Sequence, residues 1–163
     1  MIAVDTNVLV YAHRSDGPNH RPALDALSAL AGHGSRWAIP WPCVHEFVAV
    51  CTGPAFGDVR TPLEDALRVV EDWLSHPACT TLGETERHFS TLAALCRRAD
   101  LRGGAVHDAR IAAICIDHGV DELWSCDRDF SRFPDLPIRN PVIPSLHEPP
   151  PSTYAAVRTP ASP

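Results

Sequence analysis

Short runs of apolar residues alternate along this chain with longer segments in which apolar residues return every three or four positions. The short runs predict strands, which lie at residues 1–4, 36–40, 79–82, 122–126 and 136–141. The longer segments predict helices, which lie at residues 6–13, 20–32, 41–51, 61–76, 84–100 and 107–119. Strands that alternate with helices are typical of an α/β domain built around a mostly parallel sheet.

The pattern predicts one domain over residues 1–142, followed by a proline-rich tail over residues 143–163 that we expect to be disordered. With 163 residues, of which 45% are hydrophobic, the chain can bury a substantial core. No apolar run approaches the roughly 20 residues of a membrane span. The first residues do not resemble a signal peptide. We therefore expect a cytoplasmic protein without a membrane partner.

The charge balance argues mildly against nucleic acid as a partner. The formal net charge is −6, and all 14 basic residues are arginine. Phosphate binding usually needs a basic surface, unless cations balance the protein's own carboxylates.

The six cysteines are scattered without a CxxC pair, and we expect them to be buried hydrophobic residues in a reducing compartment.

Two carboxylates stand out against apolar surroundings in the first third of the chain. Asp5 follows the first predicted strand directly, at the carboxyl end where open α/β sheets place their ligands. It could equally cap the following helix. Glu46 is the only carboxylate of the segment 41–51, which is apolar on nearly every side and predicts a buried helix. A metal-ligand role is favoured over an ion pair with an arginine.

Two further carboxylates lie in comparable positions later in the chain. Asp108 is in the first turn of a predicted helix, in line with its apolar stripe, where it could also stabilise the helix dipole. Asp127 follows the strand at 122–126, and Asp129 comes two residues later. An aspartate-rich turn would explain both. We take Asp127 as the better ligand candidate and Asp129 as auxiliary.

One crevice above the sheet could collect all four carboxylates. Carboxylates that meet repel each other unless a cation is present. Clustered oxygen ligands suit Mg²⁺ or Mn²⁺, and such sites often act on phosphoesters.

Because Arg128 is next to Asp127, it is a candidate phosphate contact. We assign no catalytic role to His45 or His107, and we expect the tryptophans to be core or interface residues.

The segments VDTNVLVYA, HEF, HDARIAA and LWSCDRDF, in this order, resemble the PIN domain of VapC-type toxins across residues 1–142. The resemblance implies a three-layer α/β/α sandwich and a Mg²⁺- or Mn²⁺-dependent endoribonuclease. It matches Asp5, Glu46, Asp108 and Asp127 to an acidic quartet that holds the metal for hydrolysis of RNA by an activated water. Thr6 matches a hydroxyl residue that helps to hold the site. Such proteins are usually homodimeric toxins of type II toxin–antitoxin pairs, neutralised by a small antitoxin.

Two other functions are weighed against this one. A non-catalytic protein-binding module of the same fold would retain the architecture without needing the quartet. A phosphatase of the haloacid-dehalogenase type also starts with a strand and an aspartate. That family requires a second aspartate two residues later, where this chain has Asn7, and a lysine, which this chain lacks.

Overall fold

The computed structural model describes residues 1–54 and 59–143, and these form a sheet of five strands in the order β3-β2-β1-β4-β5. All four strand pairs are parallel. The strands are β1 (Ile2–Val4), β2 (Trp37–Pro40), β3 (Cys79–Leu82), β4 (Glu122–Trp124) and β5 (Ile138–Arg139). The predicted α/β architecture is therefore confirmed, including the last edge strand.

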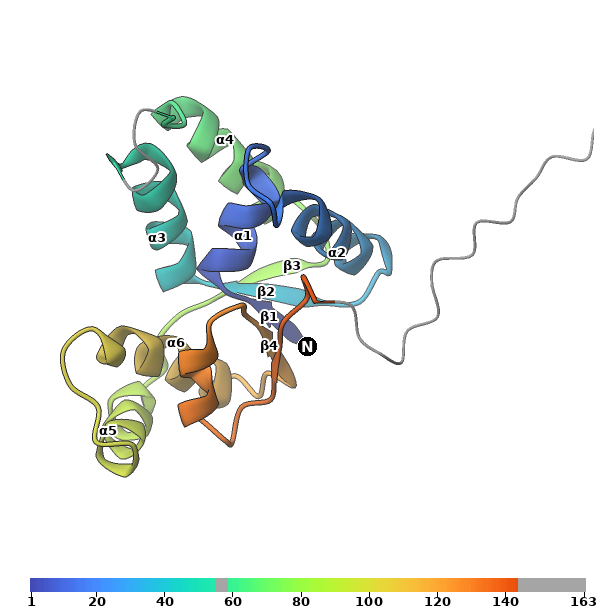
Figure 1. Cartoon of the computed structure of the whole chain (residues 1–163). Helices are drawn as coiled ribbons and strands as arrows, with labels where there is room; N and C mark the ends of the chain where they lie inside the picture. Colours follow the sequence, from blue (N-terminus) through green and yellow to red (C-terminus); the bar gives the residue numbers. More distant parts are fainter. Residues whose placement is uncertain (55–58, 144–163) are drawn as a thin grey trace, which may run out of the picture.

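Helices cover both faces of the sheet. They are α1 (Thr6–His13), α2 (His20–Gly32), α3 (Trp41–Thr52), α4 (Leu63–Leu74), α5 (His88–Arg98) and α6 (Ala105–Asp117), with a short 3₁₀ helix, η2 (Arg128–Arg132). Figure 1 shows α1 to α4 on one face and α5, α6 and the η2 segment on the other. The three-layer sandwich is confirmed. Among the described residues, no helix is long and apolar enough to span a membrane.

The central strands are buried because helices cover them from both sides. Ala3 and Val4 of β1 are inaccessible to solvent, and all four residues of β2 are buried. Helix α6 supplies a continuous buried run over residues 111–115, which explains its weak amphipathic pattern. Continuous apolar strands are what a parallel sheet with two covered faces requires.

Two helices begin later than predicted. Helix α4 begins at Leu63 with Pro62 as its N-cap, and the preceding Thr61 donates its N–H to the carbonyl of Cys51. Helix α5 begins at His88 rather than at residue 84. The preceding residues form a turn in which the Thr85 hydroxyl accepts from the Arg87 N–H and donates to Asp117. Local side-chain hydrogen bonds of this kind compete with helix formation.

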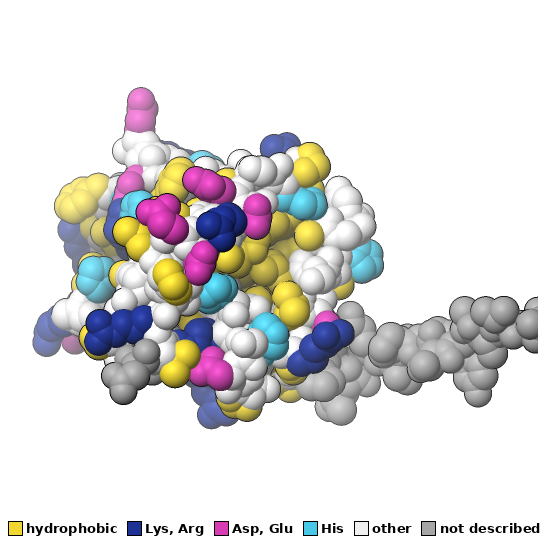
Figure 2. Space-filling view, turned by 90° about the horizontal axis from the view of Figure 1, so that it is seen from above, with side chains coloured by type: hydrophobic (Ala, Val, Ile, Leu, Met, Phe, Trp, Pro, Cys, Tyr) yellow, Lys and Arg dark blue, Asp and Glu magenta, His cyan; other side chains and the backbone are white. Residues whose placement is uncertain are grey.

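The surface over the α1–α4 layer mixes acidic, arginine and histidine side chains, and no continuous basic area covers this face of the described part (Figure 2). Of the predicted tail, residues 144–163 lie outside the described residues, so the boundary at residue 142 stays a prediction.

Candidate active site

The strand order changes direction between β1 and β4. After β1 the chain moves outward to β2 on one side, and β4 and β5 are added on the other. The carboxyl ends of strands at such a switch point form the ligand crevice of open α/β sheets. Asp5 follows β1 directly, and its N–H donates to the carbonyl of Trp124 at the end of β4, 3.0 Å away.

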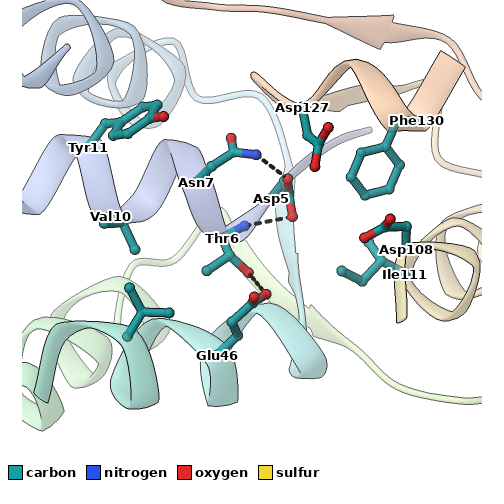
Figure 3. A pocket seen from close by; sticks show the side chains of 11 residues that line it. Asp5, Thr6, Asn7, Val10, Tyr11, Glu46, Asp108, Ile111, Asp127 and Phe130 are labelled. Atoms are coloured by element: carbon teal, nitrogen blue, oxygen red, sulfur yellow. Dashed lines mark hydrogen bonds between the residues drawn. The ribbon is translucent and has the colours of Figure 1, made fainter. Parts of the chain in front are cut away.

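A pocket of about 320 Å³ opens at this point and contains all four predicted carboxylates, Asp5, Glu46, Asp108 and Asp127. Figure 3 shows them entering from separate elements: the β1–α1 junction, α3, α6 and the start of η2. The remaining wall is formed by neighbouring side chains, which are Thr6, Asn7, Val10, Tyr11, Val50, Ile111 and Phe130. Residues from distant parts of the sequence therefore meet at the end of the sheet.

The Asp5 carboxylate is the most enclosed of the four, with only 4% of the residue exposed. One oxygen, Oδ1, accepts from the Thr6 N–H at 2.8 Å and from the Cys43 thiol at 3.7 Å. The other, Oδ2, accepts from the Ser125 hydroxyl at 2.7 Å and from the Asn7 amide at 2.6 Å. Four donors therefore fix the orientation of this group.

Burial nevertheless raises the pKa of Asp5 to about 6. The hydrogen bonds from Ser125 and Thr6 oppose the shift, and the nearby charge of Glu46 adds to it. Burial also raises the pKa of Asp108, and the charges of Asp127 and Asp129 raise it further. Both shifts mark a site in which negative charges lack sufficient compensation from the protein.

Glu46 is held by a hydroxyl and not by a cation. The Thr6 Oγ1 donates to Glu46 Oε2 at 2.7 Å (Figure 3). Among residues 1–54 and 59–143, no arginine forms a salt bridge with Glu46. The expectation of a helix buried on nearly every side was wrong, because Glu46 and Ala49 are exposed on the pocket side of α3. Only the opposite face, with Val44 and Phe47, is buried.

Asp127 caps η2, and its Oδ1 accepts from the Asp129 N–H at 2.8 Å. Its own N–H donates to the Ser125 Oγ at 3.0 Å. Ser125 therefore connects Asp5 and Asp127 through one hydroxyl group. The turn predicted as an alternative explanation for Asp127 is present, together with its place in the pocket.

The two auxiliary candidates near Asp127 lie outside this pocket. The Asp129 carboxylate pairs with Arg132 at 3.0 Å and does not line the pocket. The charge of this carboxylate helps to raise the pKa of Asp108. Arg128 is exposed and lines a neighbouring hollow with Ser125, Cys126 and Asp127.

Sequence reasoning missed three residues that hold Asp5. These are Asn7, Ser125 and Cys43. Asn7 also accepts from the Cys126 N–H at 2.9 Å, and so ties the end of β4 to the start of α1. The usable signal was a small polar residue at the end of each central strand, in DTN and in WSCD. Asn7 holds Asp5, and its amide cannot act as the acid or base of the phosphatase type.

The donor set fits a hard divalent cation. All four carboxylates offer oxygen ligands. The pKa values of Asp5 and Asp108 are raised, and a cation bound beside them would lower both again. Within the described part of the chain, no three carboxylate, imidazole or thiol groups already converge on one point. Asp5, Glu46 and Asp127 instead accept hydrogen bonds from protein donors.

Comparison with known proteins agrees with this geometry. The PIN domain family profile matches residues 2–136. The chain is similar to ribonuclease VapC43 of Mycobacterium tuberculosis, with 33% identity over 90% of this chain and 99% of the relative. It is also similar to ribonuclease VapC25 of the same organism, with 32% identity over 87% of this chain and 100% of the relative.

A solved toxin–antitoxin complex from Klebsiella pneumoniae contains a chain of the same fold. The two chains superpose with a TM-score of 0.58 and 19% identity, over 86% of this chain and 98% of the other. At that identity the likeness concerns the fold alone. Together, the matching profile and the full-length relatives show that the chain belongs to the PIN-domain family of VapC ribonucleases.

Proposed function

We propose that this protein is a metal-dependent endoribonuclease and the toxin of a type II toxin–antitoxin pair. The observation that carries the proposal is the pocket at the switch point, which gathers Asp5, Glu46, Asp108 and Asp127 from four separate elements. Its relatives VapC43 and VapC25 are named as ribonucleases. A non-catalytic module would have no need to accumulate charges that raise each other's pKa.

The four carboxylates would hold Mg²⁺ or Mn²⁺. A divalent cation there supplies Lewis-acid stabilisation of a phosphodiester and lowers the pKa of a coordinated water. The protein's part is positioning: Ser125 and Asn7 hold Asp5, and Thr6 holds Glu46. Phe130 and Ile111 are buried and close one side of the pocket. They restrict the access of bulk water to the reacting phosphate.

The proposal extends to partners and location. Because a chain of the same fold occurs in a toxin–antitoxin complex from Klebsiella pneumoniae, we infer a small cognate antitoxin. We infer a homodimer from the resemblance to VapC-type toxins. RNA is the substrate, as for the named relatives. The six cysteines are all free thiols, which is typical of a reducing compartment, and we infer that the protein acts in the cytoplasm.

Cleavage of total RNA by the antitoxin-free protein tests the proposal. Cuts are expected with Mg²⁺ or Mn²⁺ and not with EDTA. Asp5→Asn should lower the cleavage rate at least about 100-fold, since the metal stabilises the transition state by several kcal/mol. Asp25→Asn is the matched control, because Asp25 is exposed on α2 and pairs only with Arg21. Equal rates for wild type and Asp5→Asn would contradict the assignment.

A further inference from the structure

A second pocket, of about 510 Å³, continues from the carboxylate pocket. The two share Glu46, Asp108 and Ile111 as a common wall. A strand whose phosphate lies at the carboxylates therefore has an adjoining space for the neighbouring nucleotide. The mechanism described above makes no use of this space.

The second pocket combines apolar and hydrogen-bonding surface. His45 from α3 and His107 from α6 are both exposed and line it. Pro42 and Ala49 add apolar surface on the α3 side. Flat rings together with donors and acceptors are what proteins offer to an unpaired nucleobase. The pocket therefore has the chemistry of a base-binding site.

The His45 ring is part of an exposed aromatic stack. Trp41 lies one helical turn earlier on α3, and the two ring centroids are 5.8 Å apart with an interplanar angle of 29°. Trp41 is 40% exposed, unlike Trp37 and Trp124, which are buried. Trp41 is therefore not a core residue, and its place at an interface between chains stays a prediction. Its indole lies in an offset stack against the imidazole.

A cation borders the same pocket. Arg110 of α6 lines it, and the Arg110 Nε donates to Glu84 Oε1 at 2.7 Å. This ion pair lies at the surface, and Arg110 lines the pocket from α6 together with His107, while His45 lines it from α3. Guanidinium groups contact phosphate in fixed geometry.

We propose that this second pocket binds the nucleotide next to the scissile phosphate of single-stranded RNA, with its base stacked on His45. Trp41 supports the imidazole from the other side, and Arg110 and His107 face the phosphate of that nucleotide. That the bound nucleotide is next to the cleaved phosphate rests on the proposed ribonuclease function. The base site itself rests on the aromatic stack and the shared wall.

Binding of two labelled strands of about ten nucleotides tests the base site. One is oligoadenylate RNA, and the other has the same length and charge but abasic sugars. Fluorescence anisotropy is measured with Ca²⁺ in place of Mg²⁺, and strand integrity is checked on a gel. Wild-type protein should bind the adenylate strand about tenfold or more tightly than the abasic strand, since stacking on one aromatic ring has that effect.

The ratio of the two affinities is expected to fall toward one in His45→Ala and Trp41→Ala, and to persist in His45→Phe, which keeps a ring. His33→Ala and Phe89→Ala are matched controls, because both residues are exposed and line neither pocket; His33 directly follows α2, and Phe89 lies on α5. An unchanged ratio in His45→Ala overturns the base site. So does dissociation of a wild-type dimer by Trp41→Ala in sedimentation, because Trp41 would then be an interface residue.

The two proposals fail separately. Protein that discriminates between the strands but never cuts RNA with Mg²⁺ or Mn²⁺ keeps the base site and loses the ribonuclease function. Protein that cuts RNA, but whose His45→Ala variant keeps the wild-type affinity ratio and KM, keeps the function and loses the base site.

Discussion

At the residue scale, Asp5 serves the fold and the pocket with the same carboxylate. It caps α1 through the Thr6 N–H, and it lines the pocket beside the other three acidic groups. The sequence presented these roles as alternatives, but a residue that ends a strand and starts a helix at the switch point can take both. Its hydrogen bonds keep an expensive buried charge in one position.

Asp5 should make the stability of the metal-free protein depend on pH. Its pKa is about 6 in the folded protein against an ordinary value of 3.8, so the folded state binds the proton more tightly. The free energy of unfolding therefore falls as the pH rises from about 4 to 6, by at most about 3 kcal/mol from this group. Urea unfolding in EDTA across this range measures the effect.

Asp5→Asn is the comparison that isolates this contribution from the other carboxylates. The difference in free energy of unfolding, wild type minus Asp5→Asn, should fall between pH 4 and 6 and level off above pH 7. A difference that stays constant across the range would mean that Asp5 titrates alike in the folded and unfolded states.

Thr6 should act on the site through Glu46. Thr6→Val removes the hydroxyl that donates to Glu46 Oε2 at 2.7 Å while preserving the side chain's shape. Groups that orient metal ligands typically contribute 10- to 100-fold to metal affinity or activity. We expect a loss of about that size in RNA cleavage and in Mg²⁺ affinity. Thr6→Ser, which keeps the hydroxyl, should stay near wild type, and an equal loss in both variants would refute the role.

The sequence indicated the four carboxylates of the pocket but not the neutral groups that hold them. A charge next to an apolar strand is conspicuous, because burial is costly for it. Ser125 and Asn7 are ordinary turn residues in sequence, and their value depends on β1 and β4 being adjacent. That adjacency is a property of the sheet order, which local patterns do not encode.

At the scale of elements, α3 divides its two faces between core and pocket. Phe47 is inaccessible to solvent, and its ring packs edge-on against two others. Its ring centroid lies 4.8 Å from that of Trp73 and 5.4 Å from that of His13. The other face carries His45, Glu46 and Ala49 into the two pockets. Sequence periodicity located the helix but not this division, because Ala49 and Val50 look like core residues until an open cleft is placed beside them.

Phe47→Ala should therefore be among the more damaging core substitutions. Removing a fully buried phenylalanine typically lowers the free energy of unfolding by about 3–5 kcal/mol. Phe89→Ala is the matched control: Phe89 is 79% exposed, and its loss should change stability by less than about 0.5 kcal/mol. Chemical denaturation of both variants measures the difference, and similar values would show that α3 is not anchored by this ring.

At the scale of the whole molecule, the net charge of −6 and the mixed surface give RNA no continuous basic area on the face in Figure 2. The acidic pocket is repulsive to phosphate until a cation enters it. Mg²⁺ therefore has two roles in the proposed function, since it compensates the carboxylates and makes the pocket acceptable to the substrate.

Mg²⁺ should consequently stabilise the folded protein. At about 100 times its Kd, a ligand that binds only the folded state adds about 2.7 kcal/mol, which corresponds to a rise in Tm of about 5–10 °C for a chain of this size. Differential scanning fluorimetry at constant ionic strength measures it. Asp108→Asn should reduce the shift, and Asp25→Asn should not. A shift that survives in Asp108→Asn would place the ion elsewhere.

The pairing of β1 with β4 also has a consequence for synthesis on the ribosome. The first strand lies at the centre of the sheet, and its neighbour on one side is made only after residues 122–124 have been translated. Asp5 is translated 120 residues before its partner Ser125, and the fourth carboxylate, Asp127, follows Ser125. A ribosome that stalls midway releases a fragment in which β1 can pair with β2 but has no neighbour on its other side, and in which the site is incomplete. An unfinished chain therefore lacks the complete set of carboxylates that the proposed cleavage of RNA requires.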